Sequence, residues 1–496
     1  MRIIQVITAA LLLVCFGVGA ETIDIPDGDT VKLVNTLCTA QASGTDELTL
    51  VLAERGNYRL GPRRRWLGCL LGGRAGTIPI PPGAATVSAK VTILGRGATL
   101  DLGETSGFVV EPGGSLVVED LELRNGDLFP ALVNRGETVF RRVGIVNWRQ
   151  PYNSDRGFVA PVVNFGSLTL ANTLLAGNAL AEFPLEGFSA ESLGECATPG
   201  SAGVYNEGDL TLNNVTATGN FVALPEGQAF PTSWICGARD LVTMATGVSL
   251  VSNTLLTSSS LDSAGVLGNC SGRVTSLGYN NVPGGLDCGF DGTDDRVSES
   301  FVRTSLAEQN GRQLPAYRSA FSRISDGSPS RPPASGACET KDIRGFERRS
   351  GDCVRGALDP LAVPAFDSSF DGLWFDQQQD GQYLQISHFG ANRALITWLG
   401  FDGEGEQVWV YGVAESGNTV IQFDAFRNSG IRAENGTIDG QLAAKVWGEL
   451  NVRVDSCSNL SLTVTPAGEF PSVYRLARIT DGNALDCFDF VEFDPL

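Results

Sequence analysis

Histidine is nearly absent from the sequence: His388 is the only one among 496 residues. Zinc and haem sites draw on histidines or on closely spaced cysteine pairs, and no Cys-x-x-Cys motif occurs in the chain. A hydrolytic triad needs a base, usually histidine, and no Gly-x-Ser-x-Gly elbow accompanies His388. We therefore predict no metal site and no catalytic residue.

Positive charge is also scarce. The chain has 36 Lys and Arg against 56 Asp and Glu, which gives a net charge of −20. Such an acidic body repels nucleic acid and anionic lipid, so neither is expected as a partner. Phosphate-binding loops and dinucleotide fingerprints are missing as well. No cofactor is predicted, and calcium at carboxylate-rich loops is the one alternative that the charge leaves open.

Long apolar runs are confined to the start of the chain. Arg2 precedes the apolar run 3–16, and small residues up to Ala20 offer a cleavage site before Glu21. This is the layout of a secretory signal peptide, predicted here as residues 1–20. The run is shorter than the roughly 20 residues of a membrane-spanning helix, which disfavours an N-terminal anchor. We expect an exported protein, extracellular or on the outer cell surface, with the periplasm as the alternative, and no transmembrane segment after signal removal.

Cysteines are present in numbers that suit an exported protein. Removal of the signal, with Cys15, leaves ten of the eleven cysteines. An even number in an oxidising compartment predicts disulfide bonds. Neighbourhood along the chain suggests the pairs Cys38–Cys69, Cys196–Cys236, Cys270–Cys288, Cys338–Cys353 and Cys457–Cys487. Ten cysteines allow many other connectivities, so sequence order is only a guide to the pairing.

Short β-type segments recur after residue 90, without amphipathic helices between them. Val133-Asn-Arg-Gly136, Val163-Asn-Phe-Gly166 and Tyr205-Asn-Glu-Gly208 each precede a segment of alternating apolar residues. Alternation gives a strand with one buried face, and a single repeat cannot bury that face without a stacked neighbour. The pattern predicts an all-β fold, a right-handed parallel β-helix. An antiparallel sandwich would explain the alternation but not the constant offset from the turns.

The turns of this repeat contain glycine and asparagine. Glycines at 114, 136, 166 and 208 are separated by 22, 30 and 42 residues, as expected for a core of about 22 residues with loops of variable length on one side. We expect these turn residues to adopt positive φ and redirect the chain. Asn134, Asn164 and Asn206 share one register and are predicted to form a structural ladder of side-chain amides.

These repeats resemble those of polymorphic outer-membrane proteins and related bacterial β-helix proteins. The segment 91–101 is similar to the capping turns at the start of such proteins, and Asp342-Ile-Arg-Gly345 with Cys353-Val-Arg-Gly-Ala357 resembles the "choice-of-anchor Q" tail. The resemblance covers roughly residues 45–360 and implies the β-helix fold and a surface location. Two features depart from the family: Val-Arg follows Cys353 where Asp-Ile is usual, and no Leu-Pro-x-Thr-Gly sorting motif occurs.

The composition changes after Pro360. Four of the seven tryptophans fall in the last quarter, and the alternating segments 383–388, 393–398, 407–411 and 419–426 suggest strands of a meander. We expect residues 361–496 to form a small antiparallel β-barrel or sandwich, similar to domains at the ends of secreted proteobacterial proteins. The preceding domains are predicted as an N-terminal cap with the first β-helix turns at 21–100, and the β-helix with its C-terminal cap at 101–360.

Aromatic residues suggest how such a protein would bind. Rings of Trp148, Tyr152, Trp374, Trp398 and Trp409 would stack on sugars if they are exposed, whereas core packing is the alternative role for them. We expect a secreted or surface-associated, non-catalytic protein that is adhesive or binds polysaccharide or another cell-surface or matrix component.

The alternative function is a polysaccharide lyase or glycoside hydrolase. Many β-helix proteins are such enzymes, and they work with carboxylates that converge on one face of adjacent coils. Asp120, Glu122, Asp155, Arg156 and the loop 291–295 offer such groups, but they match no lyase or hydrolase motif. This alternative rests on fold analogy alone.

Overall fold

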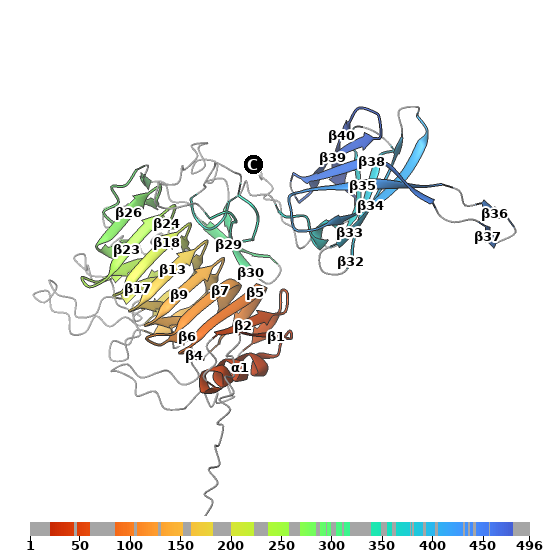
Figure 1. Cartoon of the computed structure of the whole chain (residues 1–496). Coiled ribbons are helices and arrows are strands. Elements are labelled where there is room, and N and C mark those ends of the chain that lie inside the picture. Colours follow the sequence, from red (N-terminus) through yellow and green to blue (C-terminus); the bar gives the residue numbers. More distant parts are fainter. Residues whose placement is uncertain are drawn as a thin grey trace, which may run out of the picture.

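The protein is all-β apart from short helical segments, with parallel sheets followed by a closed antiparallel barrel, in a computed structural model (Figure 1). The structure describes residues 20–43, 47–59, 85–103, 107–126, 130–151, 160–181, 200–222, 237–256, 268–283, 288–293, 295–298, 304–309, 312–317, 339–348, 355–359, 364–376, 378, 381–389, 393–401, 405–429, 432–434, 437–439, 443–455 and 457–479.

Residues 21–298 contain a body of stacked parallel strands, called here the parallel stack. Its first column comprises β1 (Glu21–Ile25), β2 (Glu47–Leu52), β5 (Lys90–Asp101), β7 (Ser115–Arg124), β9 (Glu137–Arg141), β13 (Ser167–Ala171), β18 (Asp209–Asn213), β23 (Val248–Ser252) and β26 (Val274–Gly278). The second comprises β3 (Asn57–Arg59), the ends of β5 and β7, β10 (Gly144–Val146), β14 (Leu174–Ala176), β19 (Thr216–Thr218), β24 (Leu255–Leu256), β27 (Asn281–Pro283) and β28 (Arg296–Ser298). The third comprises β4 (Ala85–Val87), β6 (Phe108–Val110), β8 (Leu132–Asn134), β12 (Val162–Asn164), β17 (Val204–Asn206), β22 (Leu241–Thr243) and β25 (Cys270–Gly272).

Each repeat contributes one strand to each of the three columns, and each strand pairs with the corresponding strand of the repeat before it. Strands β12, β13 and β14 pair in parallel with β8, β9 and β10 on one side and with β17, β18 and β19 on the other. The alternation of apolar and polar residues along a strand determines which side chains enter the core. Leu168 and Leu170 face inward, while Thr169 between them is half-buried. Each buried leucine of this kind contributes about 1.5–3 kcal/mol of burial energy.

Smaller elements complete the described part of the stack. Helix α1 (Thr30–Ser43) packs Leu33 and Leu37 into the same hydrophobic core as the first strands. The remaining strands of the stack are β11 (Arg149–Pro151), β15 (Ala179–Ala181), β20 (Phe221–Val222), β16 (Gly200–Ser201) and β21 (Gly237–Ala238). The antiparallel hairpin of β29 (Thr304–Gln309) and β30 (Arg312–Tyr317) forms a sheet of its own. Strand β5 runs across the expected domain bound at residue 100, so the first turns and the body share one sheet.

The predicted asparagine ladder is present inside the stack. Nδ2 of Asn134 donates to Oδ1 of Asn164 at 2.8 Å, and Nδ2 of Asn164 donates to Oδ1 of Asn206 at 2.8 Å. All three side chains are fully buried. Each amide therefore satisfies its neighbour in the next repeat, which is the role that the shared register predicted.

A second ladder was not predicted. The side chain of Asn178 accepts from the backbone N–H of Trp148 at 2.9 Å and donates to the carbonyl oxygen of Ile145 at 3.0 Å. One repeat later, Oδ1 of Asn220 accepts from the backbone N–H of Asn178 at 3.0 Å. This ladder satisfies backbone groups at the corner that follows the second column.

Loss of one member of the second ladder should be measurable. An Asn178→Ala variant is expected to lower the free energy of unfolding by about 2 kcal/mol, because the buried N–H of Trp148 loses its acceptor. Urea denaturation measures this change. Thr169→Ala, at a half-buried position on the outer face of β13, should change stability by less than about 0.5 kcal/mol. Equal stabilities of the two variants would contradict the ladder's role.

The expected positive φ is present at some turn residues, such as Asn147 (54°) and Gly177 (63°), but absent at glycines 114, 136, 166 and 208. Corner residues between the first and second columns also have it, including Arg142 (55°), Asn172 (47°) and Asn214 (53°). Asparagine tolerates the left-handed region better than most residues, which explains its recurrence at this corner. The expectation of positive φ at those glycines is wrong. Glycine is required there because the backbones of successive repeats approach too closely for a side chain.

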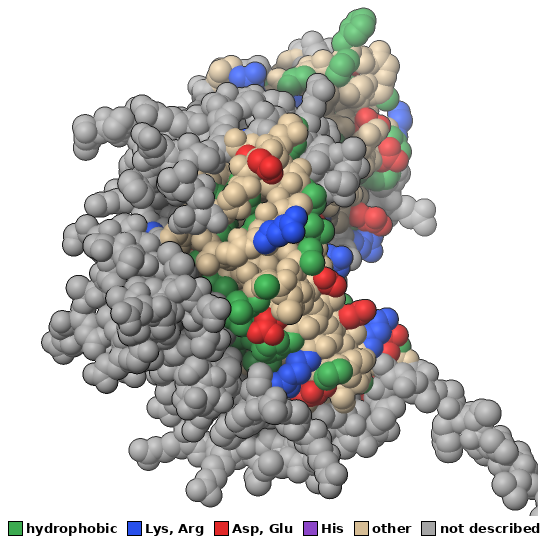
Figure 2. Space-filling model, turned by 90° about the vertical axis from the view of Figure 1, so that its left-hand side faces the viewer, with side chains coloured by type: hydrophobic (Ala, Val, Ile, Leu, Met, Phe, Trp, Pro, Cys, Tyr) green, Lys and Arg blue, Asp and Glu red, His purple; other side chains and the backbone are tan. Residues whose placement is uncertain are grey.

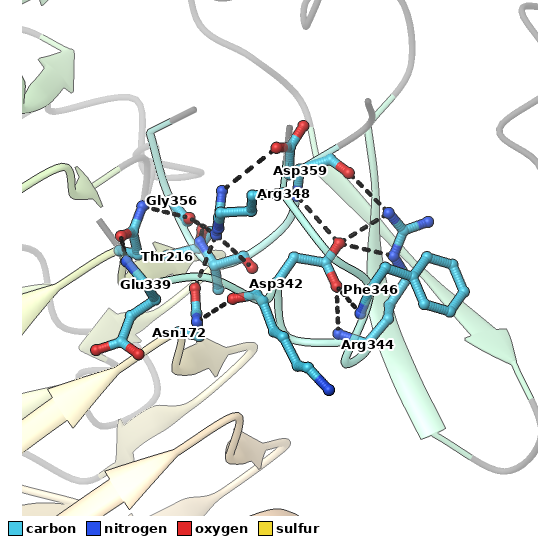
Figure 3. A network of polar contacts seen from close by, with 12 residues as sticks. Asn172, Thr216, Glu339, Asp342, Arg344, Phe346, Arg348, Gly356 and Asp359 are labelled. Carbon is cyan, nitrogen blue, oxygen red and sulfur yellow. Dashed lines mark hydrogen bonds and ion pairs between the residues drawn. The ribbon is translucent and has the colours of Figure 1, made fainter. Parts of the chain in front are cut away.

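A later segment, called here the C-terminal strap (residues 339–348 and 355–359), contacts this corner column (Figure 3). Nδ2 of Asn172 donates to the carbonyl oxygen of Lys341. The backbone N–H of Gly356 donates to the carbonyl oxygen of Asn253 at 2.6 Å, and Nε of Arg355 donates to that of Tyr279 at 2.9 Å. The strap thus bridges corners of several repeats.

The barrel closes in the order β31 (Gly372–Asp376), β32 (Tyr383–Phe389), β33 (Arg393–Phe401), β34 (Gln407–Glu415), β35 (Val420–Ser429), β38 (Ala443–Val454), β39 (Asn459–Pro466) and β40 (Ser472–Arg478). A 3₁₀ turn, η2 (Ser368–Phe370), precedes it, and the hairpin β36 (Arg432–Glu434) with β37 (Thr437–Asp439) is inserted before β38. Phe366 and Phe370 are buried in the barrel core, so the segment before β31 belongs to this domain. Of the predicted alternatives, the barrel is the correct one.

Two of the predicted cysteines are joined in the described part of the chain. Cys270 and Cys288 form a disulfide with Cα atoms 4.9 Å apart, as predicted. Cys457 is also disulfide-bonded. The side chains of the other predicted cysteines, Cys38, Cys69, Cys196, Cys236, Cys338, Cys353 and Cys487, lie outside the described residues.

Charges on the described surface of the stack are balanced locally. Figure 2 shows acidic and basic side chains interspersed on one side of the molecule rather than gathered into a patch of one sign. Ion pairs between successive strands balance some charges of the stack, such as Glu119–Arg141 at 3.4 Å and Glu47–Lys90 at 2.7 Å. None of the described helices is long and apolar enough to cross a bilayer.

Candidate functional site: an aromatic face on the barrel

Side chains of the barrel strands alternate between a filled interior and the outer surface. On β33, Ala394, Ile396 and Trp398 are buried, and on β34, Val408 and Val410 are buried. The residues between them face outward, because successive side chains of a strand point to opposite faces. The described interior is packed with aliphatic and aromatic side chains, so the surface of the described barrel is where we look for a site for a large ligand.

This alternation corrects the expectation for two of the predicted barrel tryptophans. Trp374 and Trp398 are core residues: Nε1 of Trp374 donates to the carbonyl oxygen of Phe370 at 3.0 Å, and the ring of Trp398 lies 5.7 Å from that of Trp447. Neither ring is available to stack on a sugar. Trp409 is different, with 68% of its surface exposed.

The predicted aromatic residues of the parallel stack do not form a described surface either. Trp148 is 0% exposed, and its ring lies over Gly126, where an added Cβ would be 2.0 Å from the ring. The expectation of a glycan contact at Trp148 is therefore wrong, since the ring packs in the core. Tyr152 lies outside the described residues.

Around Trp409, outward side chains of four strands form an apolar surface, called here the aromatic face (Tyr383, Leu399, Trp409, Tyr411 and Phe426). The register places Tyr383, Leu399 and Trp409 in one row across β32, β33 and β34. Tyr411 on β34 pairs with Phe426 on β35, and their ring centroids are 6.3 Å apart. Exposed side chains of Leu395, Phe401, Val413 and Val446 on the same strands and β38 add to the apolar surface.

Sequence reasoning missed most of these residues. The alternation 407–411 put Trp409 and Tyr411 on one side of a strand and Val408 and Val410 on the other, but it did not show which side is buried. Scattered exposed apolar residues are normal on any protein, whereas a contiguous group with several rings is a mark of a binding surface.

A groove adjoins the aromatic face, because β34 and β35 diverge. The described register joins them at one pair, Tyr411–Phe426, whereas β33 and β34 pair continuously from Arg393–Glu415 to Phe401–Gln407. The gap has a volume of about 710 Å³. It is lined by Tyr411, Gly412, Val413, Ala414, Glu415, Asn418, Val420, Ile421, Gln422, Phe423, Asp424 and Phe426. Rings, amides and carboxylates therefore meet in one open groove.

The carboxylates proposed for an enzyme are engaged elsewhere in structural contacts. Asp120 accepts from Nε of Arg142 at 2.5 Å, a hydrogen bond that raises the pKa of Arg142. Asp295 accepts from Oγ of Ser276 at 2.5 Å and from the backbone N–H of Asn280 at 2.9 Å. Such contacts fix turns and corners between repeats.

The other proposed groups offer no better arrangement. Glu122 is buried, with Arg124 at 3.9 Å, and Asp155 and Arg156 lie outside the described residues. Groups of three or more metal-ligating side chains do not occur among the described residues.

His388 is also held in a structural contact. Its Nδ1 lies 2.6 Å from Oδ1 of Asp371, and its ring is 5.1 Å from that of Phe366. Its Nε2 is buried in the barrel wall. The pair resembles half of a triad, but the nitrogen that would take a proton from a nucleophile does not reach the surface.

No protein-family model, no curated protein and no solved structure matches this chain. The aromatic face and its groove are therefore interpreted from their own geometry and chemistry.

Proposed function

We propose that this is an exported, non-catalytic protein that binds a glycan through the aromatic face of its barrel. The observation that carries the proposal is the 68% exposure of Trp409 in a continuous row of apolar and aromatic side chains. A tryptophan in that position loses burial energy unless a partner covers it. Sugar rings present flat C–H faces that cover aromatic rings, and their hydroxyl groups suit the amides and carboxylates of the groove.

We also propose that the parallel stack is a right-handed β-helix that carries the barrel at the cell surface or in an extracellular matrix. Support for the helix comes from the order in which the chain visits the three columns and from the parallel register between repeats. Right-handed connections between parallel strands are by far the commoner ones. The signal-like N-terminus and the resemblance to choice-of-anchor proteins support export and surface attachment.

Binding should depend on one ring. A Trp409→Ala variant is expected to bind its polysaccharide roughly 30-fold more weakly, the effect of losing about 2 kcal/mol at a central aromatic contact. Pull-down with cellulose, chitin, mannan and glucan particles identifies the polysaccharide, and depletion isotherms give the affinities. Trp409→Phe should retain most of the binding, because the ring remains.

The matched control is Phe470→Ala, since Phe470 is 93% exposed in the turn between β39 and β40. Its loss should leave the affinity unchanged. Unaltered binding by Trp409→Ala would exclude the aromatic face as the site. Oligosaccharide released into the supernatant by the wild-type protein would contradict a non-catalytic role.

A further inference from the structure

The groove beside the aromatic face carries charge of one sign. Its charged lining residues in the described structure are Glu415 and Asp424, and both side chains are exposed. Across β35 and β38, Asp424 stands opposite Glu449, which adds a third carboxylate close by. Carboxylates held near one another by a fixed backbone attract a cation, because bringing one there relieves their repulsion.

Two basic side chains near the groove have other partners in the described contacts. Arg393 stands opposite Glu415 in the register, but its guanidinium lies over the ring of Phe389, 5.5 Å from the centroid. Arg453, further along β38, pairs with Asp455 at 2.8 Å. Anionic sugars would therefore meet repulsion at the groove, in a chain whose net charge is already −20.

From this geometry we infer that the groove selects glycans with free amino groups, that is, partly deacetylated amino-sugar polymers. Each sugar presents an apolar face to Tyr411 or Phe426 and an ammonium group to Glu415 or Asp424. The ammonium then makes charge-assisted hydrogen bonds to a carboxylate and lies near the aromatic rings, which attract cations. The amide groups of Gln422 and Asn418 in the lining suit the remaining hydroxyl groups.

This inference deepens the proposed function and rests on it. The preferred glycan would be cationic, whereas the substrates of enzymes that act on polyuronates are anionic at every sugar. The aromatic face supplies general affinity for sugar rings, and the two carboxylates supply the preference among glycans.

The test compares oligomers of equal length that differ in charge: glucosamine, N-acetylglucosamine and galacturonate oligomers, titrated calorimetrically into the full-length protein. The wild type is expected to bind the glucosamine oligomer about tenfold more tightly than the acetylated one, and the galacturonate oligomer most weakly. A Glu415→Gln/Asp424→Asn variant should lose the tenfold preference and keep its affinity for the acetylated oligomer. Added salt should reduce the preference in the wild type.

The control for unspecific charge is Glu137→Gln/Glu469→Gln, which makes the same change in net charge at exposed positions of β9 and of the turn after β39. It should keep the tenfold preference. Equal affinity of the wild type for the two amino-sugar oligomers, or equal loss in both double variants, would overturn the inference. If the acetylated oligomer binds in a Trp409-dependent way without any amine preference, the proposed function stands and only this inference fails. If no glycan binds, both fail.

Discussion

An Arg348→Ala variant is expected to lose about 3–5 kcal/mol of the free energy of unfolding, because the buried guanidinium makes several hydrogen bonds and an ion pair that the variant lacks. Its side chain is only 2% exposed. Nη2 donates to Oδ1 of Asn172 at 2.7 Å and to the carbonyl oxygens of Gly356 and Ala357 at 2.9 and 3.1 Å. Nη1 lies 3.8 Å from Oδ2 of Asp359. Urea denaturation measures the loss.

The surroundings of Arg348 explain why a single residue has this effect. Burial lowers the pKa of Arg348, while Asp342 and Asp359 act in the opposite direction. Asp342 is itself buried and bound by Arg344 at 2.8 Å. Removing the guanidinium would take one cation away from the buried carboxylate of Asp359. It would also remove one hydrogen bond between the strap and Asn172, while the bond from Asn172 to Lys341 remains (Figure 3).

The strap offers its own control. Lys341 and Glu347 form an ion pair at 3.5 Å with side chains 41% and 42% exposed. Lys341→Ala should cost less than about 1 kcal/mol, because exposed pairs contribute little. If Arg348→Ala and Lys341→Ala lost similar amounts of the free energy of unfolding, the backbone contacts of the strap, and not the Arg348 side chain, would hold it in place. A stability of Arg348→Ala within about 1 kcal/mol of the wild type would contradict the view that the buried network fastens the strap.

The strap also shows where sequence reasoning ends. Arg348 and Asn172 are 176 residues apart, and no periodicity connects them. The resemblance of residues 342–357 to a known tail singled out the segment but gave no partners for it. Only the stacked corners bring Asn172, Asn214 and Asn253 into one line that the strap can follow.

The first asparagine ladder could be predicted because its residues recur at the same position of successive sequence repeats. Asn134, Asn164 and Asn206 stand at the same offset from a glycine, so stacking in register must place them together. The aromatic face could not be predicted, because the alternation of side chains along a strand separates its two sides without showing which side is buried. Trp398 and Trp409 look alike in sequence, yet one fills the barrel core and the other is exposed.

The turn glycines were found from the sequence, but for the wrong reason. They stand in a column in which each α-carbon lies against the carbonyl oxygen of the glycine before it. An added Cβ would be 2.3 Å from that oxygen at Gly136, 2.2 Å at Gly166 and 2.1 Å at Gly208. Side chains are excluded by the close approach of successive backbones, not by φ.

Gly166→Ala is therefore expected to lower the free energy of unfolding by about 3 kcal/mol, near the upper end for inserting one methyl group into a packed site. The obstacle is backbone, which cannot rotate away as the end of a side chain can. Relief requires the spacing of two repeats to increase, and that would stretch the Asn134–Asn164 hydrogen bond beside it. Urea denaturation of the full-length protein gives the size of the loss.

Gly144→Ala is the comparison that isolates this effect. It lies in β10 of the same stack, and its added Cβ would be no closer than 3.4 Å to any neighbour, an ordinary contact. Its stability should stay within about 1 kcal/mol of the wild type, with a gain from the less flexible unfolded chain. If Gly166→Ala behaved the same way, the repeats would tolerate a wider spacing, and neither the glycine column nor the asparagine ladder would fix their distance. A large loss confined to Gly166 means that glycine at this turn sets how closely the repeats stack, and that the ladder can form because of it.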